Sequence, residues 1–183
     1  MAHVIHSINT TASGLCHHLD SIIDDAHHQY AIDLARSADA LVLGRNTFDL
    51  FMEFWPNAAT RSDLPEMTAA LANALNTVPK LVISSRPIEL TWNNTNHVRG
   101  PDLEPLKNEL TKLAGTVVIF GSPRLATSLL NEGLINEIHI LTQPFIGTEG
   151  PQAYRGLKKR AELDLIGTTQ FPTGSVLLRY NVT

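Results

Sequence analysis

Guanidinium and hydroxyl side chains follow three apolar runs of this 183-residue chain, and a glycine or a pair of serines accompanies them each time. Guanidinium forks, hydroxyls and main-chain N–H groups at a helix start are the groups that bind phosphate oxygens. Three such exits together predict a ligand that carries several phosphates. The exits are, in chain order, Gly44-Arg45-Asn46-Thr47, Ser84-Ser85-Arg86 and Gly121-Ser122-Pro123-Arg124.

Each exit taken alone has a simpler interpretation. Glycine after a strand usually makes a turn, a Ser-Ser pair is typical of turns, and an arginine at a helix start is mostly solvated or paired with an acid. The binding hypothesis depends on the coincidence of all three, because the carboxyl ends of parallel strands meet in one crevice. Neither G-x-G-x-x-G nor G-x-x-x-x-G-K-[ST] occurs, so neither the common dinucleotide-binding fold nor a P-loop is supported.

The elements that position these exits alternate between strand-like and helix-like patterns, which is typical of an α/β fold. The pattern predicts strands over 4–8, 40–43, 80–84, 116–120, 137–143, 162–171 and 175–182. It predicts helices over 22–37, over 63–76 with Asp63 as the N-cap, over 103–114 closed by Gly115, and over 123–132 capped by Ser122 and ended by Gly133. The turn in "TTQFPTGSVLLRY" predicts an antiparallel C-terminal hairpin, so the sheet is expected to be mixed and parallel in its middle.

Composition bounds the partners and the setting of the chain. With 43% hydrophobic and 17% charged residues, we expect one soluble globular domain over residues 1–183. Its 14 lysines and arginines against 18 acids give a net charge of -4 and form no basic stripe, so a nucleic acid is not an expected partner. No run approaches the roughly 18 apolar residues of a membrane span. The N-terminus resembles no export signal and Cys16 stands alone, so we expect a cytoplasmic protein.

Eight histidines raise the question of a metal site. The pair His17-His18 precedes the first expected helix and His27-His28 lies within it, but adjacent helical side chains point about 100° apart and cannot chelate one ion. No His-x3-His with a carboxylate completes a ligand set. We therefore expect no metal.

Four segments of the chain resemble a known family. They are "DALVLGRNTFDLFMEFWP", "ALNTVPKLVISSRPIELTWNNT", "VVIFGSPRLATSLLNEGLINEIHILTQPFIGTEG" and "FPTGSVLLRY". Over about residues 38–183 they resemble the bacterial dihydrofolate-reductase-like family, which shares its fold with the C-terminal reductase domain of the bifunctional riboflavin-biosynthesis deaminase/reductase. The resemblance implies a three-layer α/β fold with a mixed, mostly parallel central sheet, flanking helices and an antiparallel C-terminal hairpin.

The resemblance also implies NADPH as the cofactor. It assigns the phosphates to the strand exits described above. The assigned residues are Gly44, Arg45 and Thr47 for the phosphates, Ser84 and Ser85 with Arg45 nearby for the 2′-phosphate region, and Gly121, Ser122, Arg124 and Leu125 for the pyrophosphate. The anion sites expected from the residues and those implied by the family coincide.

The substrate side departs from the family pattern. Many relatives have S-L-D-G where this chain has "NTTASG", so Ser13 and Gly14 fall in the segment that passes under the nicotinamide ring, and the acid is missing. Dihydrofolate reductases hold the pterin with a carboxylate on the first helix. Spacing back from Gly44 leaves Asp24 or Asp25 for that role, and we favour Asp25 as the catalytic acid; the alternative is a solvated acid at a helix start.

Two aromatic residues complete the expected site. Phe51 and Trp55 either wall the substrate or belong to the core or a dimer surface. No strong general acid stands out, so water or a substrate group is expected to deliver the proton.

The expected function is an NADPH-dependent reductase that transfers a hydride to a small pyrimidine- or pterin-like heterocycle. It resembles the 5-amino-6-(5-phosphoribosylamino)uracil reductase of riboflavin biosynthesis, although the chain has no H-x-E with P-C-x-x-C that would mark a deaminase. The alternatives are dihydrofolate reductase activity and a non-catalytic NADP-binding or sensing module. We expect a homodimer.

Overall fold

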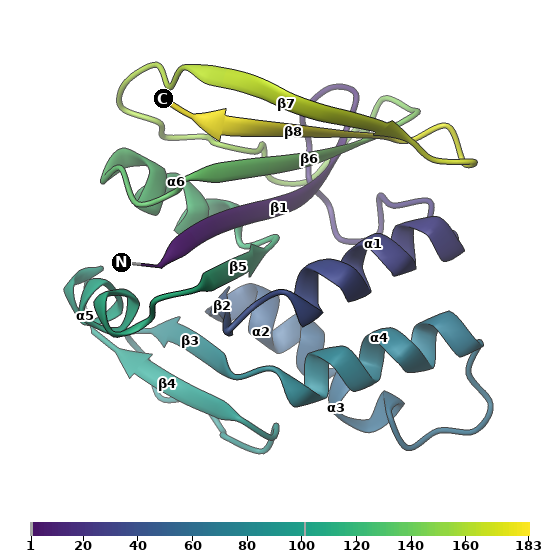
Figure 1. Cartoon of the computed structure of the whole chain (residues 1–183), viewed down its shortest axis with the longest axis horizontal. Helices are drawn as coiled ribbons and strands as arrows, with labels where there is room; N and C mark the ends of the chain where they lie inside the picture. The colour runs from purple at the N-terminus through teal and green to yellow at the C-terminus, as the bar shows by residue number, and fades with distance from the viewer. Residues whose placement is uncertain (1, 101) are drawn as a thin grey trace. The chain divides into compact units, whose positions relative to one another are not determined.

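The computed structural model describes residues 2–100 and 102–183, in which eight strands form one mixed sheet in the order β4-β3-β2-β5-β1-β6-β8-β7 (Figure 1). The strands are β1 (His3–Thr11), β2 (Ala40–Gly44), β3 (Lys80–Ser84), β4 (Thr95–Arg99), β5 (Thr116–Phe120), β6 (Glu137–Gln143), β7 (Leu163–Gln170) and β8 (Val176–Val182). The helices are α1 (Asp25–Arg36), α2 (Arg45–Met52), α3 (Trp55–Ala58), α4 (Glu66–Thr77), α5 (Glu104–Lys112) and α6 (Pro123–Asn131). The predicted α/β class and the mixed, mostly parallel sheet are confirmed.

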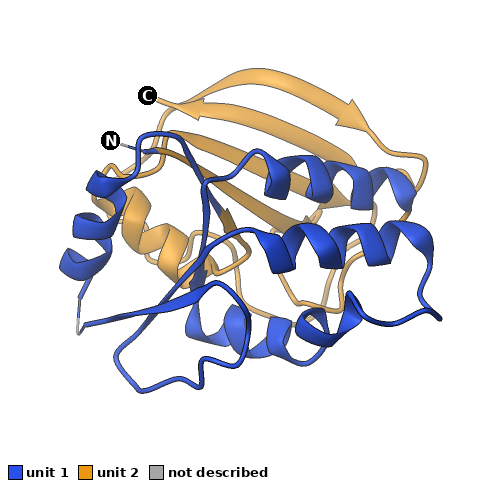
Figure 2. Cartoon of the chain, turned by 60° about the horizontal axis from the view of Figure 1, so that its bottom comes forward, with its two compact units in different colours: residues 1–2, 25–118 blue, residues 3–24, 119–183 orange. Residues whose placement is uncertain are grey.

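The chain divides into two compact units (Figure 2). The first comprises residues 1–2 and 25–118, and the second comprises residues 3–24 and 119–183. The boundary falls within β5. The single domain expected over residues 1–183 stays a prediction.

In the first unit, β2, β3 and β4 are parallel neighbours. Leu41, Val42 and Leu43 of β2 are fully buried, as expected of a parallel strand that is covered on both faces. Helices α1 and α4 lie side by side (Figures 1 and 2). Helix α4 buries a stripe that includes Leu71 and Leu75, so its apolar residues recur at helical spacing toward the core.

A buried lysine closes the C-terminal end of α4. The Lys80 ammonium donates to the carbonyl oxygens of Leu75 at 2.7 Å and Val78 at 2.8 Å, and it lies 4.5 Å from the centre of the Trp92 ring. These carbonyls carry the negative end of the helix dipole, so the cation is stabilised there. Burial nevertheless lowers the pKa of Lys80 to about 8.

The second unit has the predicted antiparallel end. Strands β1 and β6 are parallel, whereas β6 pairs with β8, and β8 with β7, in antiparallel register. The β7–β8 hairpin closes on hydrogen bonds between Phe171 and Ser175 and between Gly174 and Phe171. Gly174 has φ 86°, a left-handed conformation in which glycine avoids the Cβ clash. The predicted hairpin is confirmed.

Several sequence predictions are corrected. Strand β4 was not predicted, because its sequence "TNHVR" is polar and only Val98 is buried. The expected N-cap Asp63 lies outside α4, which begins at Glu66 after Pro65, and Asp63 instead pairs with Arg61 at 2.6 Å.

Over residues 2–100 and 102–183, no helix has the length and apolar character needed to span a bilayer.

Candidate functional site

Three neighbouring parallel strands of the first unit end at the same edge. The register pairs Gly44 of β2 with Ile83 of β3, and Ser84 of β3 with Arg99 of β4. The exits after β2 and β3 are therefore adjacent, as the sequence predicted, and Arg99 extends the row by one strand. Sequence analysis missed Arg99 because it missed β4. The only available signal was a basic residue followed by Gly100 after a short run containing valine.

Arg45 begins α2 and is largely occupied by an intramolecular ion pair. Its Nε donates to both carboxylate oxygens of Asp49, at 2.8 and 2.7 Å, and its Nη1 donates to the carbonyl oxygen of Pro87 at 3.0 Å. The two side chains are 39% and 51% exposed, so the pair is solvent-screened and worth at most about 1 kcal/mol. A competing phosphate could therefore displace Asp49 at small cost.

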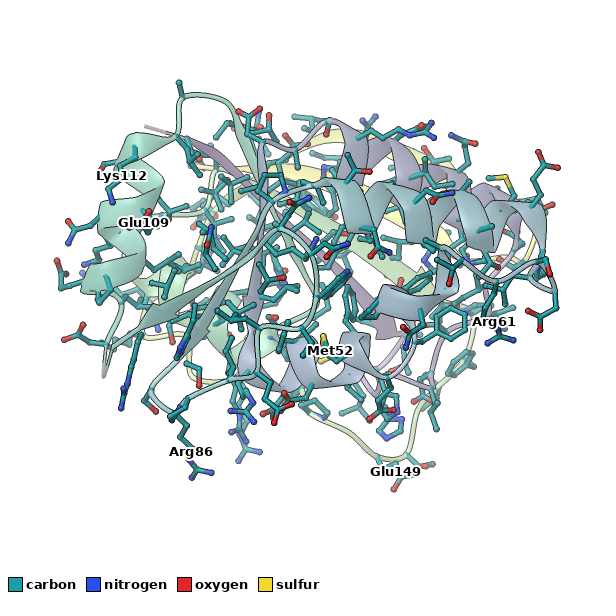
Figure 3. All side chains as sticks on the ribbon, turned by 90° about the horizontal axis from the view of Figure 1, so that it is seen from below. Met52, Arg61, Arg86, Glu109, Lys112 and Glu149 are labelled. Atoms are coloured by element: carbon teal, nitrogen blue, oxygen red, sulfur yellow. The ribbon has the colours of Figure 1, made fainter. Side chains whose placement is uncertain are left out.

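The second exit forms a tight local turn. The Ser84 hydroxyl donates to the carbonyl oxygen of Arg86 at 2.8 Å and accepts from its N–H at 3.1 Å, so the hydroxyl of this buried residue is used inside the turn. The turn leaves Ser85 and Arg86 exposed. In Figure 3 the Arg86 side chain extends away from the ribbon, and within the described ranges its guanidinium has no hydrogen-bonded partner. Serine turn chemistry thus explains Ser84, whereas Ser85 and Arg86 remain accessible to an anion.

A hollow of about 550 Å³ lies beside Arg99. It is lined by residues of β3, β4 and α5, among them His97, Glu109 and Lys112; the last two form an ion pair at 2.7 Å and are labelled on α5 in Figure 3. The His97 Nε2 lies 3.0 Å from the carbonyl oxygen of Ser84, which ties β4 to the turn after β3. The volume lies within the range of small-molecule sites.

The start of α2 has no side-chain cap. Gly44 is the N-cap with φ -74°, and the first turn contains no acidic residue. Thr47 is the third residue of the helix and is partly exposed. No acidic residue of the first turn of α2 therefore neutralises the positive end of its dipole.

The β5–α6 turn of the second unit is built differently from the prediction. Gly121 and Ser122 both have left-handed backbones, with φ 56° and 49°, and the Ser122 side chain makes no capping hydrogen bond to α6. The expected side-chain cap is wrong, because the left-handed backbone replaces the extended one that a capping serine requires. Pro123 occupies the first turn as predicted, Arg124 is exposed and Leu125 is buried.

Two neighbouring residues of β1, His6 and Ser7, form hydrogen bonds with Gly121 in this turn. The Gly121 N–H donates to the carbonyl oxygen of Ser7 at 2.8 Å, and the Gly121 carbonyl oxygen lies 2.8 Å from Nε2 of His6. Sequence analysis did not single out His6. Its position in a strand pattern carried no signal that it would face a glycine more than a hundred residues away.

The segment after β1 is a turn closed by threonine. Thr11 accepts from Gly14 N–H through its carbonyl oxygen at 2.9 Å, and its hydroxyl contacts the Ser13 hydroxyl at 2.9 Å. Gly14 has φ 80°, and Ser13 is exposed. Both residues stay candidates for contact with the nicotinamide ring, and Gly14 has the conformation that a side chain would strain.

The two candidate acids differ in burial. Asp25 is the first residue of α1 and is exposed, whereas Asp24 is partly buried and its Oδ2 is inaccessible. The exposed position of Asp25 corresponds to the alternative of a solvated acid at a helix start. Of the two, Asp24 is the more buried.

Phe51 and Trp55 belong to an aromatic cluster of the first unit. Phe51 lies 6.3 Å from Trp55 and 6.4 Å from Trp92, centre to centre, and Phe48 stacks on Trp92 at 6.3 Å. Both predicted residues remain partly exposed. Both rings thus pack within the first unit, and their contact with a substrate stays a prediction.

Cysteine and metal-ligating side chains are the remaining candidates for chemistry. Burial raises the pKa of the Cys16 thiol to about 11, so it is not a reactive thiolate. In the part of the chain that the structure describes, no three His, Cys, Asp or Glu side chains come together to hold a metal ion.

Comparison with known proteins gives consistent results. The chain is 26% identical over 150 residues to the uncharacterized protein YyaP of Bacillus subtilis (strain 168), which covers 81% of this chain and 77% of YyaP. A putative riboflavin biosynthesis protein from Shewanella sp. PV-4 has a TM-score of 0.73 at 19% identity over 99% of each chain. Dihydrofolate reductase from Enterococcus faecalis, complexed with NADP(H) and RAB-propyl, has a TM-score of 0.65 at 14% identity over 99% of this chain and 96% of that one. These likenesses confirm the dihydrofolate-reductase-like fold.

A family model decides the relationship. The model of the RibD C-terminal domain matches residues 10–177, which include every strand exit described above. The chain therefore belongs to the RibD C-terminal domain family.

Proposed function

We propose that this chain is an NADPH-dependent reductase that transfers a hydride to a small pyrimidine-like heterocycle, of the kind reduced in riboflavin biosynthesis. Membership of the RibD C-terminal domain family supports an oxidoreductase that acts on such a substrate. The observation that carries NADPH is the row of basic side chains where β2, β3 and β4 end, namely Arg45, Arg86 and Arg99.

The donor set of this row fits a phosphate monoester. Arg86 and Arg99 are exposed, and Ser85 adds an exposed hydroxyl beside them. Planar guanidinium groups match the oxygens of a phosphate dianion and discriminate it from a neutral hydroxyl. We therefore assign the 2′-phosphate to Ser85, Arg86 and Arg99, with Arg45 as a further donor once Asp49 is displaced. Ser84 then acts by shaping the turn.

The remaining phosphates are assigned to the two helix starts. Gly44 and Thr47 present the uncapped end of α2. Gly121, Ser122, Arg124 and Leu125 present the start of α6, where a left-handed turn precedes a proline at the first helical position. Main-chain N–H groups at a helix start and the positive end of the helix dipole suit a pyrophosphate.

The chemistry is divided between cofactor and protein. NADPH supplies the hydride, and the chain supplies position and exclusion of water. Ser13 and Gly14 line the nicotinamide segment, Phe51 and Trp55 offer apolar faces to the substrate, and the acid preceding α1 orients the heterocycle. On burial we assign that last role to Asp24 rather than Asp25. Water or a group of the substrate supplies the proton.

Dihydrofolate reduction is the second candidate. The partly buried carboxylate of Asp24, placed just before α1, favours it, because a pterin presents an N–C–N edge that such a carboxylate can pair with. Oxidation of NADPH followed with a panel of ribosylaminopyrimidines and dihydropterins decides between the two. Turnover with the pyrimidines only supports the primary proposal, and turnover with dihydropterins only supports the second. Binding of NADPH without turnover on any panel member leaves a non-catalytic binding module.

We also propose that the protein is a homodimer. Strand β7 exposes Leu165 and Ile166, at 57% and 45% of their surface, and Leu163 at 37%. An edge strand with exposed apolar side chains is a surface that a second copy would cover. Light scattering after size exclusion tests this.

A further inference from the structure

A non-glycine residue in a left-handed conformation stands at the start of α6. Ser122 has φ 49° and ψ 49°, which costs roughly 1–2 kcal/mol relative to a right-handed backbone. Such a conformation persists only where its surroundings determine it. The peptide group that joins Gly121 to Ser122 must therefore be held in place by its neighbours.

His6 holds the oxygen of this peptide group. Its Nε2 lies 2.8 Å from the Gly121 carbonyl oxygen, and a carbonyl oxygen only accepts, so Nε2 carries the proton. The other ring nitrogen, Nδ1, lies 2.9 Å from the Tyr154 hydroxyl. His6 is fully buried, and burial lowers its pKa to about 4. The ring is therefore neutral at pH 7, so Nδ1 accepts and Tyr154 O–H donates.

These roles determine the direction of both hydrogen bonds that link Tyr154, His6 and Gly121. Tyr154 donates to His6, and His6 donates to Gly121. The two rings also meet edge to face, with centres 5.5 Å apart and an interplanar angle of 87°. Because a trans peptide is planar, fixing the Gly121 carbonyl toward His6 turns the Ser122 N–H to the opposite side, away from His6. The hydrogen bond from one buried ring thus fixes the orientation of the peptide plane that precedes α6.

The segment that contains Tyr154 is itself tied to the turn after β1. Cys16 N–H donates to the Pro151 carbonyl oxygen at 2.8 Å, and Ala153 N–H donates to the Gly14 carbonyl oxygen at 3.0 Å. Tyr154 also has a left-handed backbone, with φ 57°, so its surroundings determine its conformation as they do that of Ser122. One segment therefore touches both the turn at Gly14 and the support of the turn at Gly121.

We propose that His6 and Tyr154 are positioning residues that hold the Gly121–Ser122 peptide group in its left-handed turn at the start of α6, where the proposed function puts the pyrophosphate of the cofactor. This inference rests on the proposed function, because it concerns the pyrophosphate assigned to the α6 start. Neither residue touches the cofactor; each acts through the backbone of Gly121.

The experiment compares NADPH dissociation constants, measured by fluorescence titration, for the wild type, H6Q, H6L and Y154F. The amide nitrogen of glutamine can occupy the Nε2 position and keep the donor to Gly121, whereas leucine keeps only volume. We expect H6L to bind NADPH about tenfold more weakly, Y154F about three- to fivefold more weakly, and H6Q within about twofold of the wild type. H3Q and Y180F are the matched controls, because they make the same chemical changes elsewhere on the sheet of the same unit.

Nitrogen-correlated NMR of the imidazole gives a readout that a general loss of stability would not move. The wild type should show the Nε2–H tautomer at neutral pH, and Y154F should keep this tautomer with a shifted Nδ1 signal, because Nδ1 loses its donor while the Gly121 carbonyl oxygen still accepts from Nε2. An H6L variant that folds and binds NADPH as the wild type does overturns the inference; should H6L not fold, wild-type affinity in Y154F overturns it. Affinity in H6Q as poor as in H6L also overturns it. Absence of NADPH binding by the wild type refutes the proposed function itself, and the inference with it.

Discussion

Acid should destabilise this protein through one buried histidine. The pKa of His6 is held at about 4, below its ordinary value of 6.5, because burial disfavours the charged ring. In the unfolded chain His6 takes up a proton as the pH falls through about 6.5, whereas in the folded chain it does so only near pH 4. Between these values the unfolded state binds more protons, so stability is fully present above about pH 6.5 and is lost progressively toward pH 4.

The magnitude follows from the two pKa values. A difference between 6.5 and about 4 corresponds to about 3 kcal/mol in the free energy of unfolding. This is a large share of the roughly 5–15 kcal/mol that stabilises a typical domain. His6 is fully buried, so solvent does not screen this effect.

Urea unfolding followed by tryptophan fluorescence measures this loss. We expect the free energy of unfolding of the wild type to fall by about 3 kcal/mol more than that of H6Q between about pH 7 and pH 4. H3Q is the control, since His3 lies on the same strand as His6 and is exposed, so its removal reports the background from a histidine outside the core. Parallel pH profiles for the wild type and H6Q would refute the reasoning, because they would mean that His6 titrates alike in both states.

Three further changes have defined outcomes. Arg99→Ala should weaken NADPH binding about fivefold, and NADH binding less than twofold, because an exposed charge-assisted contact to the 2′-phosphate is worth about 1 kcal/mol; titration of both cofactors measures it. Asn76→Ala should lower the free energy of unfolding by about 2–3 kcal/mol in urea, because Trp92 Nε1 and the Trp55 carbonyl oxygen, each 2.9 Å from the Asn76 amide, lose their partner. Leu165→Glu should shift the molar mass found by light scattering from dimer to monomer, because it places a charge in the apolar row of β7.

Each of these predictions has a matched control. Arg155→Ala removes an exposed arginine of the second unit, Asn73→Ala removes an exposed asparagine of α4, and Leu90→Glu replaces an exposed leucine outside β7. Equal losses of NADPH and NADH affinity in Arg99→Ala would remove the assignment of the 2′-phosphate. An Asn76→Ala variant as stable as Asn73→Ala would show that the hydrogen bonds of Asn76 to Trp55 and Trp92 do not contribute to the free energy of unfolding. An unchanged molar mass in Leu165→Glu would exclude β7 as the dimer interface.

The strands of the sheet were largely predictable from the order of residues. Strands β3, β5 and β6 have the bounds expected from sequence. Buried strands consist of short runs of apolar and β-branched residues, which can be recognised from the local sequence pattern. Gly133 ends α6 with φ 67°, as its position after an amphipathic stretch indicated. Strand β4 escaped detection, since an edge strand buries little and leaves almost no apolar record.

The candidate site was predicted as residue types at strand ends and could not be predicted as geometry. The Ser84 hydroxyl is used within its own turn, and Arg45 is paired with Asp49. Asp24 is partly buried, whereas Asp25 is exposed. All three features depend on side-chain directions that the sequence pattern does not encode. Each is decided by competition among neighbours within hydrogen-bond reach.

Long-range pairing lies furthest from the sequence. The buried ammonium of Lys80 and the path from Tyr154 through His6 to Gly121 join residues whose local surroundings predict only a strand or a loop. Local propensity acts over a few residues, so it establishes where strands begin and helices end. Whether a buried polar group has a partner is settled only when distant segments pack together, because desolvation makes an unpaired group costly and leaves few arrangements that satisfy it.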